Sequence, residues 1–247
     1  MNVTDGTLLD GRVIYRQPAT GHRSGIEPVL LAASVPARAG ARVLEGGSGA
    51  GAGLLCLAAR VAGVFGVGVE IAAEPLACAE ANAIANNAVN LRFVAGDLTD
   101  ATLDLGQDAR FDHAIANPPW HPPGTASPDT NRELARRAPK SVFANWATAL
   151  ASRVRHHGSL TMVFPAAALP EALAAITTAG CGSSSIFPLW PKPGAAAKLV
   201  LVRAVKNGRG PCRLLAGLVL HNPDGSFTPA TEAILRHGTA LSWDGAD

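Results

Sequence analysis

One pattern recurs four times in this sequence: a short apolar segment ends at a residue whose side chain carries an oxygen acceptor. Helical periodicity lies between these segments, so the pattern predicts alternating helices and strands with the strands in parallel. The four acceptor residues are Glu45, Glu70, Asp97 and Asn117. Because open α/β sheets bind ligands outside the carboxyl ends of their strands, we expect these side chains to line one ligand site. A single such residue could also be a helix N-cap or a solvated strand end, but the ordered set is specific.

Glycine alternates with other residues directly after the first segment. Gly47, Gly49 and Gly51 stand between a strand at residues 42–45 and an apolar helical stretch at residues 54–61. Such a loop lets the backbone approach a ligand and offers the free N–H groups of a helix N-terminus. Dinucleotide-binding loops have G-x-G-x-x-G spacing instead, and a carboxylate at Glu45 would repel a pyrophosphate. The same carboxylate suits the ammonium end of an amino-acid-like cofactor, which disfavours a nicotinamide oxidoreductase.

The next two acceptors suit the nucleoside part of such a cofactor. Glu70 lies nineteen residues after Gly51 and is placed to hydrogen-bond ribose hydroxyls. Asp97 follows a third strand at residues 91–95 and is placed to accept from an adenine amino group.

The fourth strand, residues 111–116, runs into Asn117-Pro118-Pro119-Trp120. Each proline fixes its own φ, and Pro119 pushes Pro118 toward an extended conformation. The Asn117 carboxamide and nearby carbonyls are therefore held as acceptors beside a flat aromatic face. This arrangement suits a planar conjugated amine, although an ordinary proline turn after a strand is the alternative interpretation.

With these motifs the chain resembles class I S-adenosylmethionine-dependent methyltransferases that modify amino groups, and among them the tRNA adenine N6-methyltransferase family. The glycine loop is common to class I enzymes, and Asn-Pro-Pro-aromatic is shared by enzymes acting on adenine N6, guanine N2 and the glutamine amide. The narrower resemblance lies at residues 22–32, 187–202 and 218–228, within a match over roughly residues 12–238. The chain departs from the family at Gly46, where an aliphatic residue is usual, and at His22 and Ser24, where aromatic residues often flank the arginine.

The resemblance implies a single Rossmann-like α/β domain. We expect a mostly parallel seven-stranded sheet with an antiparallel last strand, followed by a short C-terminal hairpin and helix. The organisation would be a lead-in and helix at 1–40, the methyltransferase domain at 41–206, and a hairpin and helix packed on that domain at 207–247. Periodicity predicts helices at residues 27–38, 74–87, 141–157 and 170–179.

The implied reaction moves a methyl group from S-adenosylmethionine to the N6 amine of an adenine in tRNA. Asn117 and Pro118 would accept the two amine hydrogens, and Trp120 would stack on the base beside Pro119. The expected cofactor residues are Glu45, Gly47, Gly49, Gly51, Glu70 and Asp97. The alternatives are an N5-glutamine methyltransferase of a translation protein, an N2-guanine rRNA methyltransferase, and a non-catalytic module that binds the cofactor or RNA.

Charge is unevenly distributed along the chain, although the net charge is only +2. Residues 1–120 hold 8 Lys and Arg against 12 Asp and Glu, whereas residues 121–247 hold 13 against 7. This asymmetry favours a polyanionic partner such as tRNA, with a chance drift of surface charge as the alternative. Candidate phosphate contacts are Arg132, Arg136, Arg137 and Lys140 in a proline-rich loop, and Lys192 and Lys198 further on.

Other classes are disfavoured by composition. No uncharged apolar run is long enough to span a membrane, and no signal peptide is evident. The four cysteines are scattered without a CxxC pair, so we expect neither a disulfide framework nor a metal site. A cytoplasmic protein is expected.

Overall fold

The structure is a computed structural model, and it describes residues 2–21, 23–106, 110–120 and 142–243. The strands are β1 (Val3–Leu8), β2 (Val13–Pro18), β3 (Arg42–Gly46), β4 (Phe65–Glu70), β5 (Leu91–Ala95), β6 (Phe111–Ala116), β7 (Val154–Pro165), β8 (Cys181–Trp190), β9 (Leu199–Lys206), β10 (Arg213–Leu214) and β11 (Leu218–Val219). The helices are α1 (Glu27–Ser34), α2 (Ala52–Arg60), α3 (Ala73–Ala85), α5 (Val142–Arg153), α6 (Leu169–Thr178) and α7 (Pro229–His237), with a 3₁₀ turn at Ala166–Ala168. Within these residues, no helix is long and apolar enough to cross a membrane.

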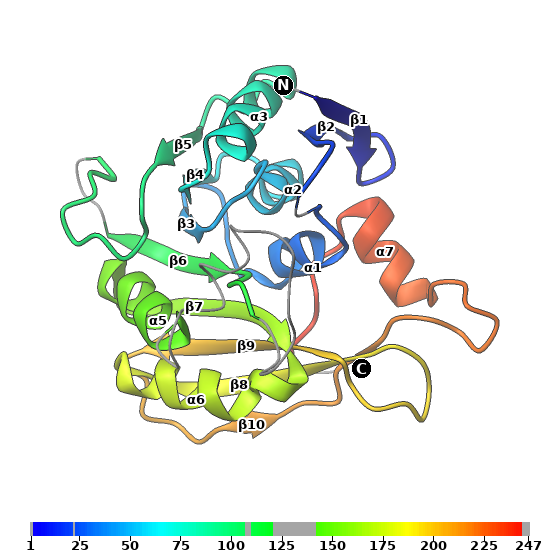
Figure 1. The fold of residues 1–247 in the computed structure, drawn as a ribbon. Coiled ribbons are helices and arrows are strands. Elements are labelled where there is room, and N and C mark those ends of the chain that lie inside the picture. Colours follow the sequence, from blue (N-terminus) through cyan, green and yellow to red (C-terminus); the bar gives the residue numbers. More distant parts are fainter. Residues whose placement is uncertain (1, 22, 107–109, 121–141, 244–247) are drawn as a thin grey trace.

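The main sheet has the order β10-β8-β9-β7-β6-β3-β4-β5 (Figure 1). The short strand β11 also pairs with β8. The pairs from β7 through β6, β3 and β4 to β5 are parallel, and β9 runs antiparallel between β7 and β8. The chain moves outward from β3 to β5 and then returns to β6 on the other side of β3. The predicted fold class is therefore confirmed, and β3 and β6 flank the point where the strand order reverses.

Helices cover both faces of the sheet (Figure 1). On one face α1, α2, α3 and α7 share a buried apolar cluster that includes Leu30, Leu54 and Ile234. On the other face α5 and α6 share a second cluster, in which the rings of Phe143 and Phe164 meet edge to face at 5.5 Å. The sheet thus lies between two apolar layers, and its polar strand ends remain available at its edge.

The first residues form an antiparallel hairpin of β1 and β2 that the sequence interpretation missed. Its turn contains Asp10-Gly11, a dipeptide typical of hairpins. In β2, buried Val13 and Tyr15 alternate with exposed Ile14 and Arg16. This alternation was the available signal for a strand.

The helix predicted at residues 141–157 is too long. It ends at Arg153, and residues 154–157 instead begin β7. The register of β6 against β7 shifts between Phe111 and His113, and His157 has a positive φ of 61°. Such a bulge inserts extra residues that no helical or alternating pattern identifies.

The C-terminal segment differs from a simple hairpin. The short strands β10 and β11 each pair in parallel with β8, and the hairpin is limited to one bridge between His221 and Phe227. Helix α7 begins after Thr228, whose hydroxyl accepts from the Thr231 amide, and it ends at Gly238, which has a φ of 66°.

The residues after α7 return to the first helix. The Leu241 amide donates to the Ala33 carbonyl at 2.9 Å, and the indole N–H of Trp243 donates to the Ser34 carbonyl at 3.0 Å. Both side chains are buried, and the Trp243 ring also packs against Phe187. Leu241 and Trp243 therefore cover part of α1.

Candidate active site

The register of the sheet brings the four predicted acceptors to one edge. Gly46 pairs with Val69 on one side and with Ala116 on the other, so the next residue, Gly47, lies between Glu70 and Asn117. Glu70 pairs with Ala95, which places Asp97 just beyond the neighbouring strand end. Since adjacent strands lie about 4.8 Å apart, Asn117 is one strand away from the glycine loop.

The glycine loop follows β3 in a conformation that needs glycine. Gly47, Gly49 and Gly51 have φ of 63°, 54° and 85°. The Ser48 amide donates to the Val69 carbonyl of β4 at 3.0 Å, which holds the loop over the sheet edge. A Cβ on Gly49 would meet no atom within 4 Å among the described residues. The loop therefore faces open space at Gly49, where a ligand can approach the backbone.

Glu45 is buried beneath this loop, with 5% of its surface exposed. Its Oε2 accepts from the Leu54 amide in the first turn of α2 at 3.1 Å, and Oε1 accepts no hydrogen bond within the described part of the chain. Burial raises the pKa of this carboxyl to about 8. When this carboxyl is ionised it therefore needs a further hydrogen-bond donor, which an ammonium group would supply.

Gly53 is a site residue that the sequence interpretation missed. A Cβ at this position would overlap the Glu45 carboxylate, so only glycine leaves room for that side chain. The alternation of glycines from Gly47 continues to Gly53, and this continuation was the available signal.

Two backbone amides of the protein already donate hydrogen bonds to the Glu70 carboxylate. Its Oε2 accepts from the Gly49 amide and its Oε1 from the Ala72 amide, both at 2.8 Å. A carboxylate has about four lone-pair sites, so each oxygen keeps one free acceptor position. Two free acceptors on one carboxylate match the two adjacent hydroxyls of a ribose.

The adenine end of the expected site is open. The Oδ1 of exposed Asp97 accepts from the amide and hydroxyl of Thr99, both at 2.8 Å. Ile71, which the sequence interpretation did not single out, directly follows Glu70 and is 73% exposed. An exposed isoleucine beside Glu70 offers an apolar surface that suits a purine ring.

Gly46 does not loosen the packing behind the loop, although the family usually has an aliphatic residue there. A Cβ at Gly46 would lie 2.6 Å from Leu98 and 3.5 Å from Trp146. The same indole, from α5, packs against Gly47. Leu98 and Trp146 therefore fill the space of the missing side chain.

The Asn-Pro-Pro-Trp motif leaves the sheet at the end of β6. Asn117 is half-buried, and within the described residues its carboxamide has no hydrogen-bond partner. Pro118 is buried and Pro119 exposed. Trp120 is half-buried and packs against the apolar cluster beneath α5 and α6, beside the end of the strand.

The predicted phosphate contacts fall into two groups. Arg132, Arg136, Arg137 and Lys140 lie outside the described residues. Lys192 is exposed, and its Nζ donates to the Pro223 carbonyl at 3.2 Å. Lys198 is exposed just before β9, where its carbonyl accepts from the Ala166 amide at the end of β7.

The strand directions divide the basic half of the chain between opposite edges. Because β9 is antiparallel, Lys198 at its start lies at the same edge as Asn117, whereas Lys206 at its end lies at the opposite edge. The two ends of this strand are about 23 Å apart at 3.3 Å per residue. Arg209 follows Lys206, so only part of the basic stretch faces the site.

These residues fit S-adenosylmethionine. The loop at Gly49 is open, Glu45 offers an acceptor for an ammonium group, and Glu70 offers two for a ribose. The buried Ser48 hydroxyl also has no hydrogen-bond partner among the described residues. No group of three or more His, Cys, Asp or Glu residues suited to a metal ion occurs in the described ranges.

The family model of the methyltransferase small domain matches residues 27–164, which is more than half of the chain and includes the glycine loop and the Asn-Pro-Pro-Trp motif. The chain belongs to the methyltransferase small domain family. This membership confirms the expected class of S-adenosylmethionine-dependent methyltransferases and the expected cofactor.

Relatives with assigned names share part of the chain. A "tRNA1(Val) (adenine(37)-N6)-methyltransferase" of Haemophilus influenzae is 30% identical over 153 residues, covering 60% of this chain and 64% of the relative. One of the same name from Porphyromonas gingivalis is 34% identical over 128 residues, 49% of each chain. The matches therefore span less than two thirds of these relatives.

Solved structures of other methyltransferases have a fold similar to that of this chain. A predicted O-methyltransferase of Agrobacterium tumefaciens superposes with a TM-score of 0.71 at 23% identity, covering 87% of this chain and 98% of that one. A 16S rRNA N2 G1207 methyltransferase of Thermus thermophilus, in complex with AdoMet and guanosine, has a TM-score of 0.55 at 21% identity, covering 83% and 50%. These similarities support the same class I fold.

Proposed function

We propose that this protein transfers a methyl group from S-adenosylmethionine to the exocyclic N6 amine of an adenine in tRNA. The observation that carries the proposal is the position of Asn117. Its carboxamide has no partner among the described residues and leaves the sheet one strand away from the open glycine loop. A nucleophile held by Asn117 is therefore close to a cofactor held by that loop.

The cofactor supplies an activated methyl group on its sulfonium, so the protein mainly provides position and electrostatics. The lone pair of an adenine N6 is delocalised into the ring, which makes this nitrogen a weak nucleophile. The Asn117 side-chain oxygen and the Pro118 carbonyl would accept its two hydrogens. This grip favours a pyramidal nitrogen whose lone pair faces the methyl group, and the proton leaves after the attack.

The remaining residues hold the two ligands in line. Glu45 receives the ammonium group, the loop from Gly47 to Gly51 lies against the methionine part, and Glu70 accepts from the ribose. Asp97 and Ile71 contact the adenine of the cofactor. Trp120 stacks on the target base, with a contribution of about 1–3 kcal/mol typical for base–aromatic stacking.

One observation supports adenine in tRNA as the target, and a second supports RNA over a protein glutamine. The relatives from H. influenzae and P. gingivalis carry the name of a tRNA adenine methyltransferase. Lys192 and Lys198 are exposed at the edge of the sheet where Asn117 lies. Basic side chains beside the target site suit the phosphates of an unstacked loop, where RNA recognition by base contacts usually occurs.

The experiment is methylation of unmodified tRNA by the purified protein, followed by mass spectrometry of the digested nucleosides. We expect N6-methyladenosine with the wild type and none with Asn117→Ala. N2-methylguanosine in rRNA, or methylglutamine in a translation protein with no product in tRNA, would assign the site to one of those substrates instead. A protein that binds the cofactor and modifies none of these would be a non-catalytic module.

A further inference from the structure

Three consecutive residues of the glycine loop are each held by a different group. The Ser48 amide is bound by the Val69 carbonyl, and the Gly49 amide by the Glu70 carboxylate. The third residue, Ala50, is buried, and its carbonyl accepts from the Nδ2 of Asn82 on α3 at 3.0 Å. Unlike the first two contacts, the third therefore comes from outside the sheet.

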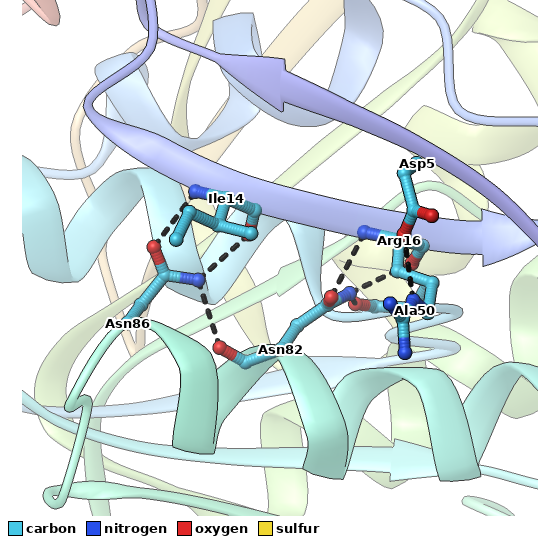
Figure 2. A network of polar contacts seen from close by, with 6 residues as sticks. All are labelled: Asp5, Ile14, Arg16, Ala50, Asn82 and Asn86. Atoms are coloured by element: carbon cyan, nitrogen blue, oxygen red, sulfur yellow. Dashed lines mark hydrogen bonds and ion pairs between the residues drawn. The ribbon is translucent and has the colours of Figure 1, made fainter.

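The carboxamide of Asn82 is itself held by the N-terminal hairpin (Figure 2). Its Oδ1 accepts from the Arg16 amide, and its Nδ2 also donates to the Arg16 carbonyl, both at 2.8 Å. These two bonds imitate the pairing of a β-strand and fix which way the amide points. Asn82 is only 1% exposed, so water does not compete for these bonds.

Asn86, one helical turn later, also hydrogen-bonds to the backbone of β2, but at Ile14. It binds the amide and the carbonyl of Ile14 at 2.8 and 2.7 Å, and it donates to the Asn82 carbonyl (Figure 2). It has no contact with the glycine loop among these bonds. The two asparagines thus dock the same strand, but only Asn82 reaches the loop.

We infer that Asn82 is a positioning residue for the cofactor loop, and that β2 serves to orient its carboxamide. Without the Nδ2 donor, the buried Ala50 carbonyl has no hydrogen-bond partner among the described residues, and a loop conformation that exposes this oxygen to water gains in population. A ligand that binds only the native loop then binds more weakly in proportion to the loss of that conformation. The inference concerns cofactor binding and holds for any of the substrates considered for the proposed function.

The test compares Asn82→Ala with Asn86→Ala by calorimetric titration with S-adenosylmethionine and by thermal unfolding. Loss of a partner for a buried polar group corresponds to about a tenfold change in an equilibrium constant. We expect the Kd to rise about tenfold in Asn82→Ala, whereas Asn86→Ala lowers the melting temperature with a Kd within about twofold of wild type.

A third variant separates hydrogen bonding from packing. Asn82→Asp keeps the size of the side chain and the acceptor for the Arg16 amide but directs a carboxylate oxygen at two carbonyls. It should therefore bind the cofactor at least as weakly as Asn82→Ala. Equal Kd values for the Asn82 and Asn86 alanine variants, or a normal Kd for Asn82→Asp, would overturn the inference. If the wild type bound no S-adenosylmethionine, the cofactor assignment would fall with it, whereas loss of tRNA methylation alone would contradict only the proposed function.

Discussion

The carboxylate of Glu70 accepts a 2.8 Å hydrogen bond from the backbone amide of Gly49. The side chain expected to bind the ribose therefore also holds the loop that is expected to face the methionine part of the cofactor. The two halves of the expected cofactor site are thus joined through Glu70, so a change in one half should affect the other.

Replacement of Glu70 by alanine should weaken S-adenosylmethionine binding by about 1.5–3 kcal/mol, because hydrogen bonds to a charged group are lost together with the loop contact. Calorimetry measures this change directly. Glu74→Ala is a matched control, since Glu74 is an exposed acid in the first turn of α3. An unchanged affinity in the Glu70 variant would mean that the ribose binds elsewhere.

Asn117→Ala should abolish methyl transfer and leave cofactor affinity nearly unchanged, because the carboxamide serves the target amine. Incorporation of tritiated methyl into tRNA reports the first quantity and calorimetry the second. Incorporation at the wild-type rate would show that Asn117 is not needed to bind the target amine. A large loss of cofactor affinity would show that Asn117 binds the cofactor instead.

Glu45 should make the free protein less stable as the pH rises. Its pKa is about 8 in the folded chain against an ordinary value of 4.5, so the folded state holds a proton that the unfolded state has lost. Its contribution to stability is fully present below pH 4.5 and is lost as the pH rises through about 8. Melting temperatures across this range should fall more steeply for the wild type than for Glu45→Gln, and parallel curves would contradict the shift.

Cofactor binding should show the opposite dependence on pH. An ammonium group beside Glu45 favours the ionised carboxylate, so binding at neutral pH releases a proton and becomes tighter as the pH rises toward about 8. The measured binding enthalpy should then vary with the ionisation enthalpy of the buffer. In Glu45→Gln this variation should vanish, and if it persists, the proton comes from another group.

The basic residues near the site should bind RNA phosphates. The double variant Lys192→Glu with Lys198→Glu should raise the Kd for tRNA and reduce the slope of log affinity against log salt by about 0.7–1 unit for each lost contact. The matched control is Arg209→Glu, because Arg209 is exposed at the opposite edge of the sheet. Equal effects of the control would indicate binding by overall charge. The same titration on the double variant Arg136→Glu with Arg137→Glu tests whether these two arginines, which lie outside the described residues, also bind phosphates.

The part of the site predicted from the sequence is the part that strand topology determines. Parallel strands must end at one edge, so Glu70, Asp97 and Asn117 could be placed together before any contact was known. The antiparallel last strand, β9, was expected from the resemblance to the family. The roles of these residues in binding and catalysis stay predictions.

Contacts between backbone groups and side chains far away in the sequence could not be predicted from sequence patterns. The bonds from Asn82 to Arg16 and Ala50 depend on how a short hairpin docks against α3, and polar residues on a helix give no sign of such a partner. The space behind Gly46 is filled by Leu98 and Trp146, which lie 52 and 100 residues further along the chain. Residues 154–157 continue the helical pattern of the sequence, but in the structure they belong to β7, next to the bulge where β7 pairs with β6.

The bonds from Leu241 and Trp243 to α1 have a consequence for biosynthesis. Their partners, Ala33 and Ser34, are made about 200 residues earlier, and a ribosome adds about 5–20 residues per second. For about ten seconds or more after α1 has been synthesised, Leu241 and Trp243 do not yet exist to cover it. During this time the apolar helix can meet chaperones or other nascent chains. A C-terminal fusion or truncation near Trp243 would thus act first on the yield of folded protein during translation, before any effect on catalysis.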